Sequence, residues 1–131
     1  MIKRTNLRVY GAIVSLVAGT LLFATSVKAQ NVDLDEIFRC IETENVTAED
    51  CDQATDLILN NCTTCHNFAP IVVQQFTPGA WQGLFDRHRD RVRHLSDEQV
   101  DLMRAYLSAN FNEELPPPEV PAALLADWTD Y

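Results

Sequence analysis

The chain has 131 residues, 47% of them hydrophobic, and its ten basic residues face nineteen acidic ones for a formal net charge of −9. This length suits one domain with an export signal and excludes two full hydrophobic cores. The negative charge excludes the broad basic surface by which many proteins bind nucleic acid.

Residues 1–29 have the organisation of a secretory signal peptide. Three basic residues lie among the first eight, the stretch 11–24 is apolar, and Ala29 ends a small-residue segment suited to cleavage. We therefore expect removal of this segment and a periplasmic location. The alternative is an uncleaved membrane anchor, although the apolar run is shorter than the roughly 20 residues of a spanning helix.

Cleavage of the signal would make the remaining chain more negatively charged. Two lysines and two arginines leave with the signal, so six arginines would face nineteen carboxylates, for a formal net charge of −13. Such a surface attracts a basic partner over long range and repels nucleic acid and anionic membranes. We therefore expect redox proteins with a basic docking surface as partners, no nucleic acid, and no stable membrane insertion after cleavage. An adaptation for solubility alone would give the same charge.

Two helices are predicted before residue 62. The first spans 31–44, with Asp33 as its N-cap and an apolar stripe along one face. The second begins after Thr47, a favourable N-cap, and runs directly into residues 62–66.

Cys40 and Cys51 fall within these two predicted helices. In an exported protein we expect them to form a disulfide that joins the helices. Metal binding is the rival interpretation, but the cysteines lack the repeated Cys-x-x-Cys spacing of a zinc site.

Residues 62–66, Cys-Thr-Thr-Cys-His, carry the most specific motif of the chain. Two thiols about one helical turn apart, followed directly by an imidazole, are the attachment pattern of c-type haem. Cys62 and Cys65 would bind the haem covalently, and His66 would be the proximal iron ligand. We expect one haem c, with its iron, as the cofactor, and a backbone carbonyl near Pro70 as the acceptor of the His66 Nδ1 proton.

Thiol–disulfide exchange through Cys62 and Cys65 is the rival interpretation of this motif. Thioredoxin-like enzymes alternate strands and helices, whereas this sequence predicts helices. Thiol–disulfide exchange would also give His66 no chemical role. We therefore favour haem attachment.

Two further helices are predicted after the motif. Thr77 and Pro78, a cap followed by proline at the first helical position, begin a helix whose apolar stripe continues to Leu95. Ser96 opens a capping box for the next helix, which runs to about Asn110.

The sequence therefore predicts an all-α domain over 30–115, followed by a proline-rich tail over 116–131. About four helices would form a bundle around the covalently attached haem. The tail would either fold back on the domain or dock a partner.

Three side chains are candidates for the sixth iron ligand. His88 lies near the centre of the third predicted stripe, where it is the one titratable group, and His94 lies about 120° away on the polar side. Met103 lies near the centre of the apolar face of the last helix. The ordinary alternative for His88 and Met103 is a place in the hydrophobic core.

Several segments beyond the haem motif resemble a group of small bacterial class I cytochromes c and the haem domains of quinohaemoprotein amine dehydrogenases. The residues that carry this resemblance are Trp81, 86–88, 95–98, Tyr106 and Leu107. The resemblance spans 57–111 and implies a cytochrome c-like fold. In that pattern a methionine ligates the iron where this chain has His88, which implies His/His ligation and a lower potential than in the Met-ligated relatives.

The expected function is single-electron transfer between exported redox partners. No catalytic set of side chains argues for an independent enzyme, although the protein could serve as a subunit or acceptor of a dehydrogenase. The alternative is a haem protein that binds or senses a small gas after its distal ligand leaves the iron.

Overall fold

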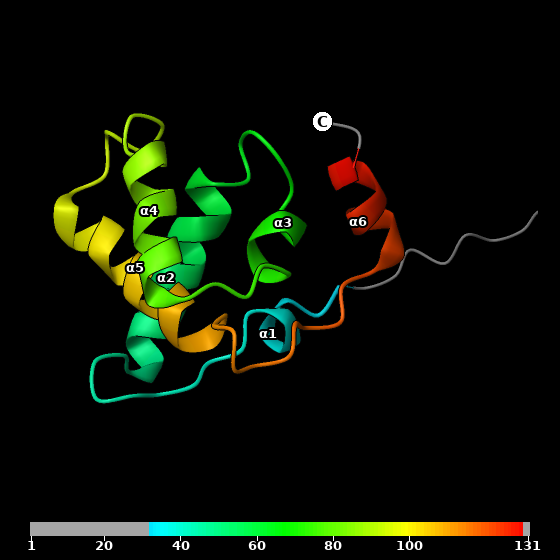
Figure 1. The fold of residues 1–131 in the computed structure, drawn as a ribbon, viewed down its shortest axis with the longest axis horizontal. Helices are drawn as coiled ribbons and strands as arrows, with labels where there is room; N and C mark the ends of the chain where they lie inside the picture. Colours follow the sequence, from blue (N-terminus) through cyan, green and yellow to red (C-terminus); the bar gives the residue numbers. More distant parts are fainter. Residues whose placement is uncertain (1–31, 130–131) are drawn as a thin grey trace, which may run out of the picture.

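The computed structural model describes residues 32–129, and within this range the chain is helical and contains no strand (Figure 1). The helices are α1 (Leu34–Ile37), α2 (Ala48–Asn61), α3 (Ala69–Val72), α4 (Pro78–His88), α5 (Asp97–Asn110) and α6 (Ala122–Thr129). The predicted all-α class is confirmed. The predicted signal peptide lies outside the described residues, and among the described helices none has the length and apolar character needed to cross a membrane.

Side-chain caps begin the three long helices, as their sequences predict. The Thr47 hydroxyl accepts a hydrogen bond from the Asp50 backbone N–H, and the Asp50 carboxylate accepts one from the Thr47 N–H. Hydrogen bonds from Thr47 lower the pKa of Asp50 below its usual value. Ser96 and Gln99 form the same reciprocal pair at the start of α5. Thr77 caps α4 by accepting from the Ala80 N–H, and Pro78 occupies the first turn of that helix.

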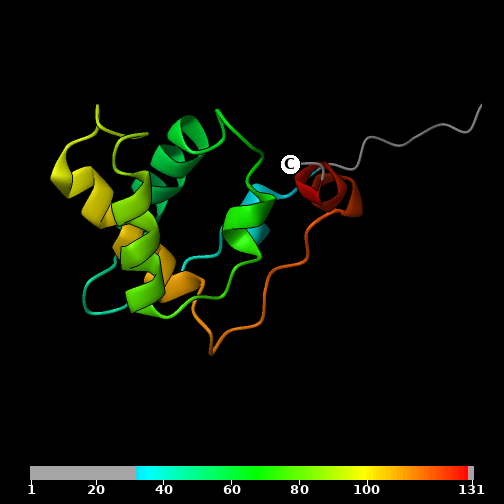
Figure 2. The same ribbon diagram turned by 45° about the horizontal axis from the view of Figure 1, so that its top comes forward.

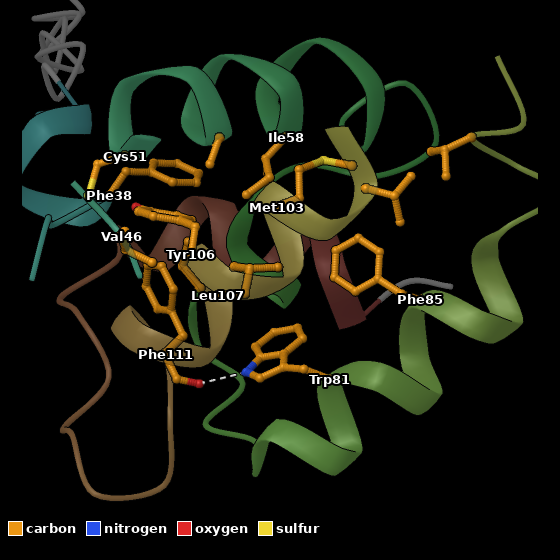
Figure 3. Close-up of a cluster of buried hydrophobic side chains, with 14 of the residues drawn as sticks. Phe38, Val46, Cys51, Ile58, Trp81, Phe85, Met103, Tyr106, Leu107 and Phe111 are labelled. Atoms are coloured by element: carbon orange, nitrogen blue, oxygen red, sulfur yellow. Dashed lines mark hydrogen bonds between the residues drawn. The ribbon is translucent and has the colours of Figure 1, made fainter. Parts of the chain in front are cut away.

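Helix α5 is the centre of the packing, because both α2 and α4 lie against it (Figures 1 and 2). The largest fully buried side chains are Trp81, Tyr106, Phe111, Ile58, Met103, Val46, Val72 and Asn110. Figure 3 shows the Trp81 ring directed at the end of α5, where its Nε1–H donates to the Phe111 carbonyl oxygen at 2.9 Å. The apolar face predicted for the helix after Ser96, which is α5, is therefore the face that is buried.

The predicted helix over 31–44 is mostly wrong. Helix α1 covers Leu34–Ile37 alone, with Asp33 as its N-cap as expected. After Phe38 the backbone leaves the helix, and the following residues cross the molecule toward a short β-bridge between Thr43 and Val46.

Contacts with α5 explain why this helix stops. The Ile41 N–H donates to the Asn110 side-chain oxygen at 2.6 Å, and the Arg39 Nε–H donates to the Asn110 carbonyl at 2.9 Å. The Tyr106 hydroxyl donates to the Arg39 carbonyl at 3.1 Å. The bonds to the Ile41 N–H and to the Arg39 carbonyl satisfy backbone groups that a longer helix would have paired internally.

The disulfide expected between Cys40 and Cys51 is present, with an S–S distance of 1.99 Å. Since Cys40 lies beyond α1, the bond joins the non-helical segment to α2 and does not join two helices.

The third predicted helix is also shorter than expected. Helix α4 ends at His88, and the chain then turns. The Arg89 guanidinium donates to the carbonyls of Val92 and Leu95 and to the Asp97 carboxylate, so one side chain holds the whole turn together. Val92 and Leu95 are nevertheless buried.

The tail over 116–131 returns to the domain, so far as its described residues extend. It is extended from Pro116 to Pro121 and then forms α6, which packs on α3 (Figures 1 and 2). Fold-back was one of the two arrangements expected for this tail.

Candidate functional site

The Cys62–His66 motif lies immediately after α2, as predicted. Cys62 is the C-cap of this helix, and its N–H donates to the Ile58 carbonyl at 2.9 Å. The Thr63 hydroxyl donates to the Leu59 carbonyl at 2.5 Å. Residues 62–65 therefore form a turn fixed to the end of a helix whose other face packs on α5.

The two cysteines of the motif are unpaired and differ in environment. Cys62 is half-buried against the core, whereas Cys65 is exposed. Burial, followed by the nearby Cys65, raises the pKa of the Cys62 thiol to about 11. Because thiol–disulfide exchange proceeds through a thiolate, this environment makes the Cys62 thiol a poor nucleophile at neutral pH.

His66 is oriented by the residue that follows it. Its Nδ1 lies 2.7 Å from the Asn67 carbonyl oxygen. A carbonyl can only accept, so Nδ1 carries the proton, and the tautomer protonated at Nδ1 has its lone pair at Nε2. The acceptor is a backbone carbonyl, as predicted, and it lies three residues before Pro70.

His88 is the last residue of α4 and is exposed. Its Nδ1 lies 2.9 Å from the Leu84 carbonyl oxygen, one helical turn earlier. The expectation of an apolar setting is not met, because α4 ends here and the stripe formed by Trp81 and Phe85 does not continue along a helix.

The other two candidates differ from His88 in their surroundings, because the His94 ring bonds to α2 and Met103 is buried in the core. The His94 Nε2 lies 2.8 Å from the Asn61 side-chain oxygen, which brings the loop after α4 against the end of α2. Met103 is fully buried in the same cluster as Ile58 and Phe85 (Figure 3).

The donor set of the motif fits a covalently held haem. Two free thiols and an imidazole with an available Nε2 are the groups that such attachment uses. Half-buried apolar side chains from α3 and the residues around it, such as Phe68, Ile71 and Phe76, lie at the edge of the core. The described residues hold no cluster of three or more metal-ligating side chains. A haem iron, with at most two protein ligands, does not require one.

Two asparagines were missed by the sequence predictions. Asn67 supplies the acceptor for His66, and its side-chain oxygen accepts from the Ala69 N–H at 2.8 Å at the start of α3. An asparagine two residues before a short helix is a signal for such a turn. The link from Asn61 to His94 has no local signal, because 33 residues separate them.

No protein-family model, curated protein or solved structure matches this chain. The function is therefore inferred from the motif, its hydrogen bonds and its burial.

Proposed function

We propose that this protein is an exported monohaem c-type cytochrome that carries single electrons between redox partners. The observation that carries the proposal is the Cys62–His66 motif with its two thiols free, while the other two cysteines are joined in a disulfide. In a four-cysteine chain this division leaves one pair for stability and one pair for attachment.

The residues of the motif would have separate tasks. Cys62 and Cys65 would hold the haem covalently at the end of α2, and His66 would ligate the iron through Nε2. The Asn67 carbonyl would keep the His66 ring in one tautomer and raise its basicity. When bound, the haem supplies an iron that alternates between the ferric and ferrous states.

Attachment can be tested by haem staining of a denaturing gel and by intact mass of the exported protein. We expect one covalent haem in the wild-type chain and none in the double variant Cys62→Ala, Cys65→Ala. The matched control is Cys40→Ser, Cys51→Ser, which removes the same number of cysteines and should retain the haem. Unstained wild-type protein would refute the proposal.

His88 is our proposed sixth ligand. Its hydrogen bond from Nδ1 to a carbonyl leaves Nε2 available, as for His66, whereas the Nε2 of His94 is bonded to Asn61. Met103 is fully buried in the core, where its side chain contributes to packing. Two imidazoles favour ferric iron, so the potential would be lower than with methionine.

Absorption spectra of the ferric protein distinguish these ligands. We expect no far-red band of methionine-ligated haem. His88→Ala should convert the spectrum from low-spin to high-spin, and His94→Ala should leave it unchanged. If the wild-type protein shows a methionine band and Met103→Leu loses it, then Met103 and not His88 is the sixth ligand.

A second candidate function is binding of a small gas at the sixth site. The exposure of His88 at the end of a helix favours it, because a ligand outside the core can leave the iron at little cost in packing. Carbon monoxide binding to the reduced protein at neutral pH would support this function, and no spectral change would support electron transfer alone.

Export and partner choice follow from sequence and charge. Signal cleavage after Ala29 would leave a surface with a formal net charge of −13, suited to a redox partner with a basic docking surface. Amino-terminal sequencing of periplasmic protein tests the cleavage site.

A further inference from the structure

Asn67 makes hydrogen bonds in three directions. Its backbone carbonyl accepts from His66 Nδ1 at 2.7 Å, and its side-chain oxygen accepts from the Ala69 N–H at 2.8 Å. Its side-chain Nδ2 donates to the Leu124 carbonyl at 2.8 Å, across 57 residues of sequence. One residue thus connects the candidate iron ligand, the start of α3 and the C-terminal helix α6.

Helix α6 is anchored on the side of the molecule that carries α3. The two helices lie side by side in both views (Figures 1 and 2) and pack against each other. Leu124 and Leu125 are only half-buried, and Ala122 and Ala123 are exposed. The described side chains at the start of α6 are at most half-buried, so this part of the helix has a low local stability and a hydrogen bond from the domain has a large effect on its docking.

We propose that Asn67 is a positioning residue that couples the docking of α6 to the orientation of His66. This inference deepens the proposed function, because His66 is the proposed iron ligand. The Asn67 side chain is held on one side by the Ala69 N–H and on the other by Leu124. With both bonds made, the peptide group that accepts from His66 is fixed, and release of α6 loosens it.

The substitution Asn67→Asp separates the two side-chain roles. It retains an oxygen that can accept from the Ala69 N–H and removes the N–H groups that donate to Leu124. The matched control is Asn60→Asp, which adds the same charge near the motif. Asn60 donates to the Asp56 carbonyl within α2.

Three readouts apply to the full-length exported protein: hydrogen exchange in α6, the ¹⁵N signals of His66 and the haem midpoint potential. The Leu124 and Leu125 N–H groups donate to the Pro121 carbonyl in the first turn of α6, so their hydrogen exchange reports docking. In Asn67→Asp their exchange should accelerate about tenfold, the effect of losing one hydrogen bond. The ¹⁵N signals of the His66 ring should shift, and the haem midpoint potential should fall as water gains access. Asn60→Asp should leave α6 exchange and the His66 signals unchanged.

A second variant separates the release of α6 from the change at residue 67. Leu124→Asp, Leu125→Asp releases α6 while Asn67 stays native, and it should shift the His66 signals in the same direction. Unchanged α6 exchange in Asn67→Asp would overturn the coupling, and so would a released α6 with unshifted His66 signals. If the protein carries no haem, the proposed function fails, but exchange and the His66 signals still test the coupling.

Discussion

His66 and His88 share a hydrogen-bonding pattern that His94 lacks. The first two donate from Nδ1 to a backbone carbonyl, whereas the third uses Nε2 in a bond to Asn61. Metal-ligating histidines commonly donate their other ring nitrogen in this way, which fixes the tautomer. At the scale of single residues, this pattern distinguishes the histidines more sharply than their positions on a helical stripe.

Cys62 leads to a pH-dependent prediction for the chain prepared without haem. Burial raises the pKa of Cys62 from 9.0 to about 11 in the folded protein. Between these values the unfolded chain loses the proton first, so the free energy of unfolding should fall as pH rises from 9 to about 11. The decrease should be at most about 2–3 kcal/mol, measured by urea titration.

Cys62→Ala is the control for this titration. The burial of Tyr106 also raises the pKa of its hydroxyl, so the wild-type chain can lose stability at high pH for a second reason. The Cys62 contribution is therefore the difference between the two proteins. Identical pH dependence would mean that the thiol is more solvated than its burial indicates.

At the scale of secondary structure, Asn110 decides the path of residues 38–46. It is fully buried, accepts from the Ile41 N–H and donates to the Tyr106 carbonyl. Arg39 adds a bond to its backbone oxygen and lies over the Phe111 ring. These contacts hold a non-helical segment against the end of α5.

Asn110→Ala should destabilise the protein by about 2–3 kcal/mol, because it removes one buried and one partly buried hydrogen bond and leaves the Ile41 N–H without its partner. Urea unfolding measures this loss. The control, Asn112→Ala, removes a half-buried amide that donates to the Ser108 and Ala109 carbonyls, and should cost less than about 1 kcal/mol. Equal losses in the two variants would contradict a special role for Asn110.

At the scale of the whole molecule, four connections hold the chain together, and two of them are made directly to α5. Helices α2 and α4 pack on it directly, and the segment before α2 reaches it through Asn110. The disulfide between Cys40 and Cys51 closes this segment onto α2, and the tail returns to α3 through α6.

Removing the disulfide should lower the free energy of unfolding of the whole domain. The bond joins residues separated by 11 positions, and a loop of this size contributes roughly 2–3 kcal/mol by constraining the unfolded chain. We expect Cys40→Ser, Cys51→Ser to unfold at correspondingly lower urea concentration with haem attachment retained. Unfolding at the wild-type concentration would show that the bond adds no stability.

The sequence predicts those features whose physical cause lies within about one helical turn. The caps at Thr47, Thr77 and Ser96 involve side chains and backbone groups three residues apart, and these three helices begin where predicted. The haem attachment motif and the order of its ligands are likewise contained in five adjacent residues.

The tertiary structure alone decides which distant groups satisfy the backbone. Ile41 ends up bonded to Asn110, 69 residues away, and Asn67 to Leu124, 57 residues away. No local pattern encodes such partners, because they meet only after the helices pack. The path of residues 38–46 and the anchoring of α6 beside His66 both have this origin.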